Sequence, residues 1–158
     1  MNQQLPLRPA TVAELRSLIG DEIGPSACRE FTQERITRFA DATEDRQWIH
    51  VDPERATAAF GSTIAHGLYT LSAGPAIMGE LIDFGGFSHS LNYGYNKVRF
   101  IAPVPAGSRV RMRATVTSAE EVPGGIQLQL VQTFEREGSE KPVAVAEALA
   151  RLVEQPAA

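Results

Sequence analysis

The sequence predicts one α+β domain, in which a curved antiparallel sheet wraps around a long central helix. Residues 66–82 are largely apolar, with small residues all round, which is typical of a helix buried on most of its faces. From about Tyr93 onward, apolar and polar side chains alternate, and short turns separate these runs as antiparallel neighbours require. A buried helix followed by such strands indicates an α+β layer arrangement.

The size of the chain is consistent with a single domain. It has 158 residues, of which 43% are hydrophobic, enough for one core and short for two domains. Residues 1–10 are proline-rich and polar, and we expect them to form a mobile lead or an arm on a partner surface. The folded domain is therefore expected over residues 11–154.

Composition argues against several kinds of partner. The net charge is −4, from 15 basic and 19 acidic residues, and the basic ones are scattered, so we expect no nucleic acid. No stretch approaches the roughly 20 uninterrupted apolar residues of a membrane span, so we expect no membrane contact. The single Cys28 rules out an intrachain disulfide, and the N-terminus lacks signal-peptide features, so a cytoplasmic location is expected.

The first expected elements are a short helix and a brief strand. Thr11 can cap a helix through about Ile19, because its hydroxyl can accept a hydrogen bond from a first-turn amide. Gly20 follows the helix end, where glycine is common. Residues 29–31 are expected to form the strand.

Two further helices are expected on either side of residues 45–50. One begins after the cap Thr32 and runs for about ten residues. Its apolar face recurs at helical spacing, at Ile36, Phe39, Ala40 and Thr43. The other begins at Asp52 and Pro53, because aspartate caps a helix and proline fits its first position, and it stops at Gly61.

Four strands are expected in the second half of the chain. The first covers residues 93–101, and in the other three alternate positions are apolar, which marks half-buried strands. These positions are Val110, Met112, Ala114 and Val116, then Ile126, Leu128, Leu130 and Phe134, then Val143, Val145, Leu149 and Val153. One sheet covers only part of its central helix and leaves edges exposed, so we expect a homodimer.

Asp45 and His50 are the most informative polar residues. A carboxylate and an imidazole are the side chains best suited to moving protons near neutral pH. On a continuous helix they would lie about 140° apart around the axis, so the chain must bend if they act together. His66 and Gly67 then open the buried helix, which suggests a proton-transfer enzyme with an anion-stabilising helix end. On spacing alone, a turn aspartate and a hydrogen-bonded core histidine explain the pair better.

Several ordered segments resemble one enzyme family. Residues 42–56 read ATEDRQWIHVDPERA and resemble the hydratase signature of MaoC-like, (R)-specific enoyl-CoA hydratases, which include short single-hotdog members of actinobacterial type. Residues 64–67, 92–100 and 102–107 resemble segments that follow in that family, namely IAHG, NYGYNKVRF and APVPAG. The resemblance covers roughly residues 31–153 and implies the hotdog fold.

The resemblance also implies a reaction and its residues. Water would add to a trans-2-enoyl-CoA to give an (R)-3-hydroxyacyl-CoA, so the expected partner is an acyl-CoA thioester. Asp45 and His50 would jointly hold and activate the water and shuttle its proton, without separate acid and base roles. The backbone amide of Gly67 would bind the thioester oxygen as negative charge develops on it. No cofactor is implied.

The chain departs from the family pattern at two places. Glu44 stands where the family usually has glycine, and it would raise the pKa of one carboxylate if it approached Asp45; we expect this effect to be small. Residues 47–49 read QWI where the family often has Asn-Pro-Leu. Trp48 could line a pocket or anchor the core, and the core is the favoured interpretation.

Other interpretations remain open at this stage. His66 is better explained as a hydrogen-bonding residue at a helix start than as a catalyst. A metal bound by Asp45, His50 and His66 is disfavoured, because their spacing matches no compact zinc motif. The rival functions are a hotdog acyl-CoA thioesterase and a non-catalytic acyl-binding or assembly subunit.

Basic residues on the strands could contact the phosphates of coenzyme A. They are Lys97, Arg99, Arg109 and Arg111. Strand-borne charges are more often just a solvated face, and that interpretation is favoured. His89 has no recognisable partner and is expected in a surface loop.

Overall fold

The fold is that of a computed structural model, which describes residues 4–155. Its helices are α1 (Val12–Ser17), α2 (Gln33–Thr43), α3 (Trp48–Val51), α4 (Pro53–Phe60) and α5 (Gly67–Leu81). Its strands are β1 (Glu22–Ile23), β2 (Arg29–Phe31), β3 (His89–Phe100), β4 (Ser108–Val122), β5 (Gly125–Arg136) and β6 (Pro142–Val153).

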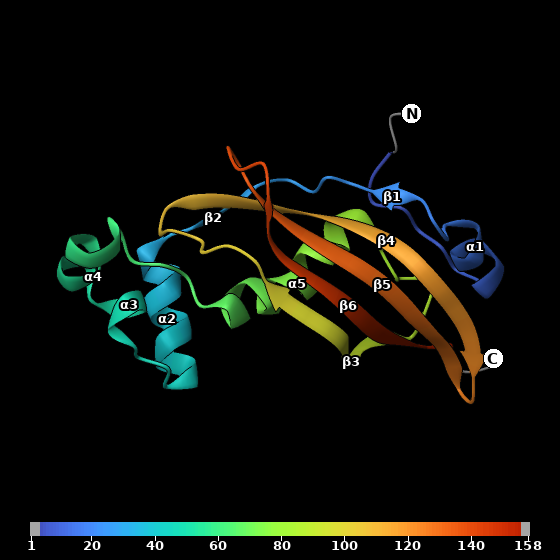
Figure 1. The fold of residues 1–158 in the computed structure, drawn as a ribbon. Coiled ribbons are helices and arrows are strands. Elements are labelled where there is room, and N and C mark those ends of the chain that lie inside the picture. Colours follow the sequence, from blue (N-terminus) through green and yellow to red (C-terminus); the bar gives the residue numbers. More distant parts are fainter. Residues whose placement is uncertain (1–3, 156–158) are drawn as a thin grey trace.

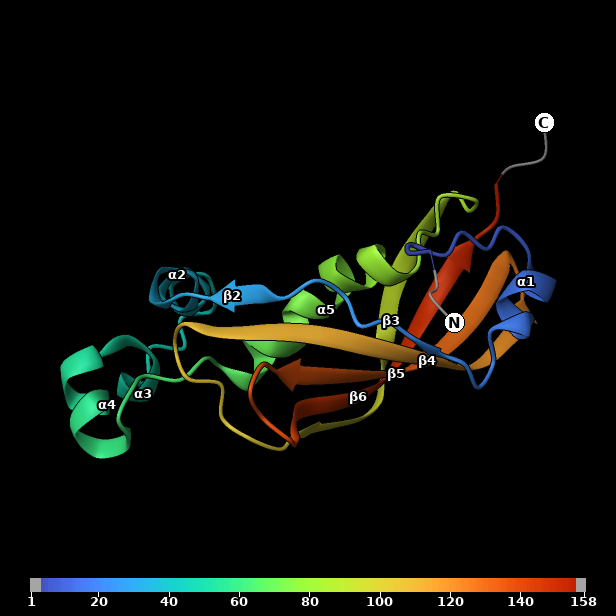
Figure 2. The same ribbon diagram turned by 90° about the horizontal axis from the view of Figure 1, so that it is seen from above.

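The strands form one antiparallel sheet against which the central helix packs. The strand order is β1-β4-β5-β6-β3, and β2 also pairs with β4. Figure 1 shows the long strands curving past α5, with α1 beyond one end of the sheet and α2, α3 and α4 beyond the other. The view from above in Figure 2 shows the same separation of these three helices from the sheet. The predicted α+β hotdog arrangement is confirmed.

The predicted helix starts agree closely with the structure. Thr11, Thr32 and Asp52 are the N-caps of α1, α2 and α4, and each side chain accepts a hydrogen bond from a backbone amide three residues later. Gly61 ends α4 with a φ of 83°, the left-handed conformation that glycine adopts readily. Within the described part of the chain, no helix is long and apolar enough to cross a membrane.

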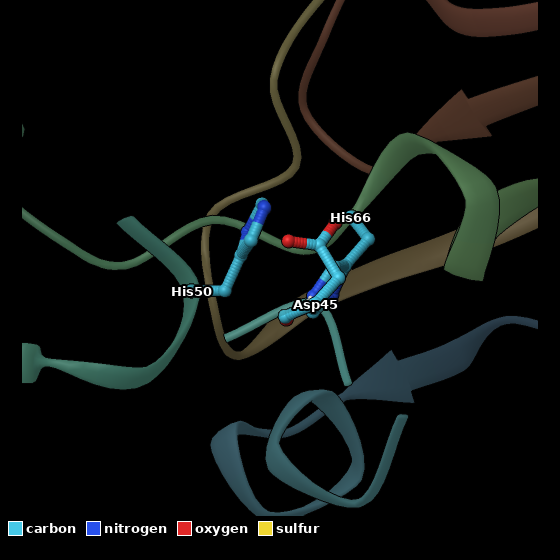
Figure 3. Close-up of side chains that lie close together, drawn as sticks. All are labelled: Asp45, His50 and His66. Carbon is cyan, nitrogen blue, oxygen red and sulfur yellow. Dashed lines mark hydrogen bonds between the residues drawn. The ribbon is translucent and has the colours of Figure 1, made fainter. Parts of the chain in front are cut away.

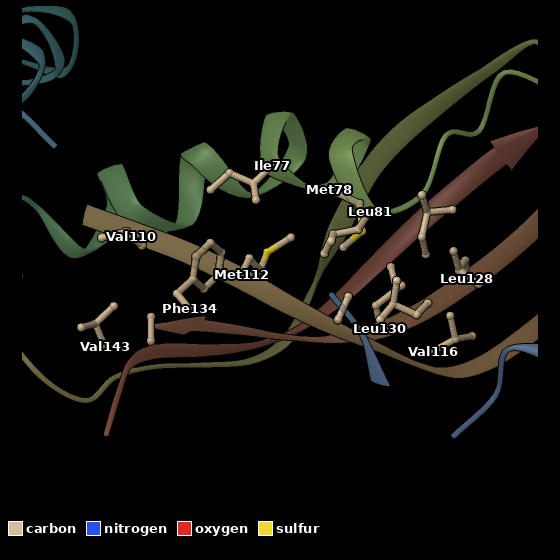
Figure 4. Packing of buried hydrophobic residues seen from close by; sticks show 14 of the residues in the cluster. Ile77, Met78, Leu81, Val110, Met112, Val116, Leu128, Leu130, Phe134 and Val143 are labelled. Carbon is tan, nitrogen blue, oxygen red and sulfur yellow. The ribbon is translucent and has the colours of Figure 1, made fainter. Parts of the chain in front are cut away.

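The core lies between one side of α5 and the inward positions of β4, β5 and β6 (Figure 4). The predicted apolar positions of β4 and β5 are all buried there. The prediction for β6 is correct at Val143 but wrong further along, because Val145, Leu149 and Val153 are only half-buried. The buried positions are Ala144, Ala146, Ala148 and Leu152. Small alanines fill the inward face, so the larger side chains indicated the wrong side of the strand.

α5 is buried on one side only in the single chain, so the expectation of burial on most faces is wrong. Its buried residues are Thr70, Gly74, Ile77, Met78 and Leu81, which face the sheet. Leu68 on the other side is 58% exposed, and Ala76 is also exposed. The single sheet covers only this side of the helix, so the second side remains exposed.

β3 is an edge strand of the sheet. It pairs on one side with β6, with register shifts near Gly94 and between Tyr95 and Lys97. None of its residues is buried, and Leu91 and Tyr93 are 51% and 59% exposed. An exposed strand with apolar side chains is a ready surface for association.

The second half of the N-terminal lead lies against the domain. The Leu7 amide donates to the Leu81 carbonyl at 2.9 Å, and the Asp83 amide donates to the Leu7 carbonyl at 2.8 Å. Arg8 forms an ion pair with Asp83, and Pro9 is buried. Residues 1–3 lie outside the described residues, and the mobility of the lead and the domain limits 11–154 stay predictions.

Candidate active site

His50 lies on a short helix rather than on the irregular connection that we expected. The four residues of α3 include it, while Asp45 follows the end of α2. The chain bends just before Asp45, because Glu44 ends α2 in the left-handed conformation with a φ of 62°, and residues 44–47 are not helical. The bend brings together two side chains that a continuous helix would have kept apart.

The backbone at Glu44 explains why the family pattern has glycine there. A residue with a Cβ takes the left-handed conformation at a cost of about 1 kcal/mol, and glycine takes it freely. The Glu44 side chain itself is exposed. The replacement of the family's glycine by Glu44 therefore changes the stability of the end of α2.

The position and tautomer of His50 are fixed by backbone hydrogen bonds. Its side chain is 6% exposed, and Nδ1 lies 2.7 Å from the Ile64 carbonyl oxygen. A carbonyl only accepts, so Nδ1 carries the proton and Nε2 of the neutral ring keeps a free lone pair. Gln33 donates from Nε2 to the His50 carbonyl at 2.7 Å, and Thr63 donates from its hydroxyl to Gln33 Oε1. Sequence reasoning missed Gln33, because a glutamine in a first helical turn has no distinguishing pattern.

His66 holds the Asp45 segment beside His50. Its Nε2 donates to the Asp45 carbonyl at 2.9 Å, and its ring stacks on that of His50 with centroids 3.7 Å apart. His66 precedes α5 but makes no side-chain capping bond, so the expected local role at the helix start is replaced by a long-range one. The Asp45, His50 and His66 side chains converge, with their potential ligand atoms within 4.8 Å of one another (Figure 3).

Burial lowers the pKa of His50 below its ordinary value. The positive charge that His66 can carry lowers the pKa further, whereas the Ile64 carbonyl and the Asp45 carboxylate raise it. The lowering causes outweigh the raising ones, so His50 stays neutral at neutral pH. A neutral ring with a free Nε2 lone pair can accept a proton.

Gly67 is the first residue of α5, where helical amides have no intrahelical partner. It does not take a positive φ, so backbone conformation does not demand glycine. A Cβ built at this position would lie 2.7 Å from the Phe100 ring. Glycine is needed because the ring at the end of β3 packs directly on the start of the helix.

A cavity of about 270 Å³ lies beside these groups. Its lining includes His50, Gly67, Thr70 and Phe100, but not Asp45. The Thr70 side chain is 1% exposed, and its hydroxyl has no hydrogen-bond partner among the described residues. Thr70 has no sequence signal beyond its position one turn after Gly67. The cavity thus joins a free imidazole nitrogen and a helix N-terminus.

The geometry of the three side chains suits a proton relay better than a metal. Each histidine uses one nitrogen on a backbone carbonyl, at Ile64 for His50 and at Asp45 for His66, which leaves one nitrogen per ring and is compatible with either role. The two rings stack at an interplanar angle of 24°, so they do not approach a common centre from tetrahedral directions. That no cofactor takes part stays a prediction.

The other singled-out residues lie outside the cavity. Trp48 is half-buried and stacks on Phe60 with ring centroids 5.6 Å apart, while the Arg55 guanidinium lies 4.2 Å from its centroid. It is therefore part of a surface cluster of α3 and α4, and the favoured interpretation as a core anchor is wrong. His89 is exposed but is the first residue of β3 rather than a loop residue.

The four basic strand residues divide into two pairs. Arg109 and Arg111 form ion pairs with Glu137 and Glu135 at 3.3 and 2.8 Å. For Lys97 and Arg99 on β3, the structure of residues 4–155 gives no ion pair. Only the second pair is available to an anionic ligand.

Comparison with known proteins assigns the chain to a family. Residues 14–134 match the model of the MaoC like domain. The chain belongs to the MaoC-like domain family. It is 48% identical over 145 residues to 3-hydroxyacyl-thioester dehydratase Z of Mycobacterium tuberculosis (strain H37Rv), covering 90% of this chain and 96% of that one. The hydro-lyase class expected from the sequence is confirmed by this match.

Further proteins resemble this chain in sequence or in fold. Nodulation protein N of Rhizobium meliloti is 37% identical, covering 86% of this chain and 87% of that one. The structure of the (R)-hydratase from A. caviae superposes with a TM-score of 0.70 at 24% identity, covering 85% of this chain and 96% of that chain. At that identity the likeness confirms the hotdog fold alone.

Proposed function

We propose that this MaoC-like chain is an (R)-specific 2-enoyl-CoA hydratase, which adds water to trans-2-enoyl-CoA to give (R)-3-hydroxyacyl-CoA. Run in reverse, the reaction dehydrates a 3-hydroxyacyl thioester, the substrate class in the name of the mycobacterial relative. A second relative, 34% identical over 99 residues, is the 3-hydroxybutyryl-CoA dehydratase of Methylorubrum extorquens. The observation that carries the proposal is the free Nε2 of a buried His50, next to Asp45 and to a cavity that begins at Gly67.

Hydration requires a base, an acid and a donor for the thioester oxygen. The water oxygen bonds to the β-carbon while its proton leaves, and the α-carbon then gains a proton. We assign proton removal and delivery jointly to Asp45 and His50, because their side chains lie close together. Negative charge develops on the thioester oxygen, and the Gly67 amide at the positive end of α5 would stabilise it.

Coenzyme A is the carrier that we propose. Lys97 and Arg99 lie on β3 just before Phe100, whose ring lines the cavity. Both are free of the ion pairs that occupy Arg109 and Arg111. Phosphate groups on the carrier would therefore meet two uncompensated positive charges near the cavity. Kinetics with one acyl chain on CoA and on acyl carrier protein would compare the two carriers.

We further propose that the working form is a homodimer in the cytoplasm. Apolar side chains on β3 and α5 are exposed in the single chain, including Leu68, Leu91 and Tyr93. A second copy related by a two-fold axis would cover the same surface on both chains. The single free Cys28 is compatible with a reducing compartment.

The test follows the conjugated enoyl-thioester absorbance of crotonyl-CoA together with the release of free thiol. Hydration predicts loss of the absorbance without thiol. Thiol release would instead identify a thioesterase, and no change in either signal would identify a non-catalytic acyl-binding subunit.

The substitutions Asp45→Asn and His50→Gln test the two residues. Each should lower kcat by about 10²–10⁴-fold, the usual contribution of general acid–base catalysis, with an unchanged circular dichroism spectrum. Arg38→Gln, on the exposed side of α2, serves as the matched control. Near-normal rates in both site variants would refute the assignment.

A further inference from the structure

A second cavity of about 380 Å³ lies along the C-terminal half of α5. Its lining is mostly apolar and includes Met78, Ile82, Leu130 and Ala148, but Gln132 also faces it. We propose that Gln132 is a specificity residue that selects acyl chains bearing a neutral oxygen group, such as a hydroxyl or a ketone, on their distal half. This inference rests on the proposed function, since it concerns the acyl chain of the same substrate.

Gln132 is a polar residue at a core position of the sheet. It lies on β5 between the buried Leu130 and Phe134, and its side chain is only 5% exposed. Its Oε1 has no hydrogen-bond partner within residues 4–155. Burying an amide without a hydrogen-bond partner is unfavourable. An unpaired amide beside a cavity therefore indicates a ligand that supplies the missing hydrogen bond.

The facing helix approaches this amide closely, and its described residues offer the amide no hydrogen bond. Gly74 of α5 lies opposite, and a Cβ there would be 3.4 Å from Gln132 Oε1 and 3.2 Å from the Phe134 ring. Any larger residue at 74 would extend further over the amide. Glycine is unfavourable inside a helix, so its presence here is consistent with the close approach of α5 to the sheet at Phe134 and Gln132.

The amide is placed to meet the middle or end of an acyl chain. Seven residues of α5 separate Gly67 from Gly74, which corresponds to about 10 Å along the helix axis. The sheet-facing residues Thr70, Gly74 and Met78 follow one another from the first cavity toward the second. A chain with its thioester oxygen at Gly67 and its tail along this face would pass Gln132.

The chemistry of the lining restricts the group that Gln132 would bind. An amide both donates and accepts hydrogen bonds, so it suits a hydroxyl or a ketone. Among the described residues, no lysine or arginine lines the cavity, and the Asp83 carboxylate on its wall is paired with Arg8, so an anionic chain end would find no free lysine or arginine there. The proposed ligand group is therefore an uncharged oxygen function.

Calorimetric binding tests the inference without requiring turnover. The probes are decanoyl-CoA and the same thioester with a hydroxyl on its terminal carbon. The wild-type chain should bind the hydroxylated probe about tenfold more tightly, the gain of one good hydrogen bond. Gln132→Met, similar in length but apolar, should remove this preference. Gln129→Met, the same change on the outward face of β5, should keep it.

Each outcome decides the inference. Equal affinities in the wild type, or a preference that persists in Gln132→Met, would overturn it. Gln132→Met should also unfold at the same or a higher temperature, because it removes an unpaired amide; a lower midpoint would mean that the amide is already satisfied inside the fold. Hydration of crotonyl-CoA, whose short chain does not reach Gln132, is assayed in parallel. If the wild-type chain does not hydrate crotonyl-CoA but still prefers the hydroxylated probe, the proposed function is wrong and the acyl specificity stands.

Discussion

His50 shows how its immediate surroundings set the chemistry of one side chain. The Ile64 carbonyl fixes the proton on Nδ1, and burial together with His66 keeps the ring neutral. The same contacts direct Nε2 away from the backbone. In the proposed mechanism, His50 could therefore act as a base without a change in its position.

The lowered pKa of His50 leads to a prediction for the pH dependence of activity. As pH falls, the folded enzyme keeps His50 neutral below the ordinary histidine pKa of about 6.5, so the acid limb of kcat/KM should lie below that value. His66→Phe keeps a stacked ring but removes the charge, so it should move the limb to higher pH. A limb that does not move would contradict the role given to His66.

The same shift has a consequence for stability. Below the ordinary histidine pKa, the unfolded chain binds a proton at His50 that the folded chain does not bind. The contribution of His50 to the free energy of unfolding should therefore fall as pH decreases and be constant above that pKa.

Glu44 offers a prediction about the helix end. Glu44→Gly should raise the free energy of unfolding by about 0.5–1 kcal/mol, because glycine relieves the left-handed strain at the end of α2. Ala42→Gly, two residues earlier and within α2, should lower it by a similar amount. Urea denaturation measures the change in the free energy of unfolding for each variant. Changes of the same sign would rule out left-handed strain at Glu44 as the cause.

At the residue scale, the sequence indicates part of the site. Asp45, His50 and Gly67 follow from an ordered motif. Thr70 and Gln132 could not be predicted, because a polar residue at a core position looks the same in sequence whether or not it has a partner in the fold.

At the scale of elements, the start of α5 depends on the end of β3. The Phe100 ring lies where a side chain of residue 67 would have to lie. Segments 33 residues apart thus shape one wall of the cavity, and the helix start is fixed by a strand that follows it in the chain.

Gly67→Ala should therefore act through packing. The added methyl should lower stability by about 1–3 kcal/mol and reduce kcat/KM, although the alanine keeps its backbone amide. In a Phe100→Ala background the penalty should be much smaller, which a double-mutant cycle of unfolding and kinetics would measure. An equal penalty in both backgrounds would show that the ring is not the cause.

Element types were easier to predict than the faces they bury. The caps Thr11, Thr32 and Asp52 determine helix starts through hydrogen bonds to residues three positions later. The helix starts could therefore be predicted from short stretches of sequence. The buried face of β6 depends on how closely α5 approaches, and there Ala146 and Ala148 are inside while Val145 is not. That distance is a property of the assembled fold.

At the scale of the whole molecule, the open side of α5 and the edge strand β3 predict association. Wild-type protein should sediment at about twice the 17.1 kDa mass of one chain. Tyr93→Glu, which places like charges across a two-fold interface, should weaken the dimer at least about tenfold. Phe60→Glu, at an aromatic residue on α4 that is 65% exposed, is the matched control. A control that dissociates equally, or a monomeric wild type, would contradict the proposed interface.

The three helices beyond the end of the sheet have one more consequence. α2, α3 and α4 contact mainly one another, and aromatic contacts from Phe39 to His66 and Tyr69 join them to α5. Hydrogen bonds from His50 to the Ile64 carbonyl and from His66 to the Asp45 carbonyl also join this layer to the segment before α5. A small layer whose contacts are mainly internal can open locally without unfolding of the sheet. Amide hydrogen exchange should therefore be faster in the layer that carries Asp45 and His50 than in the sheet. On heating, enzyme activity should be lost before the sheet amides lose their protection from exchange.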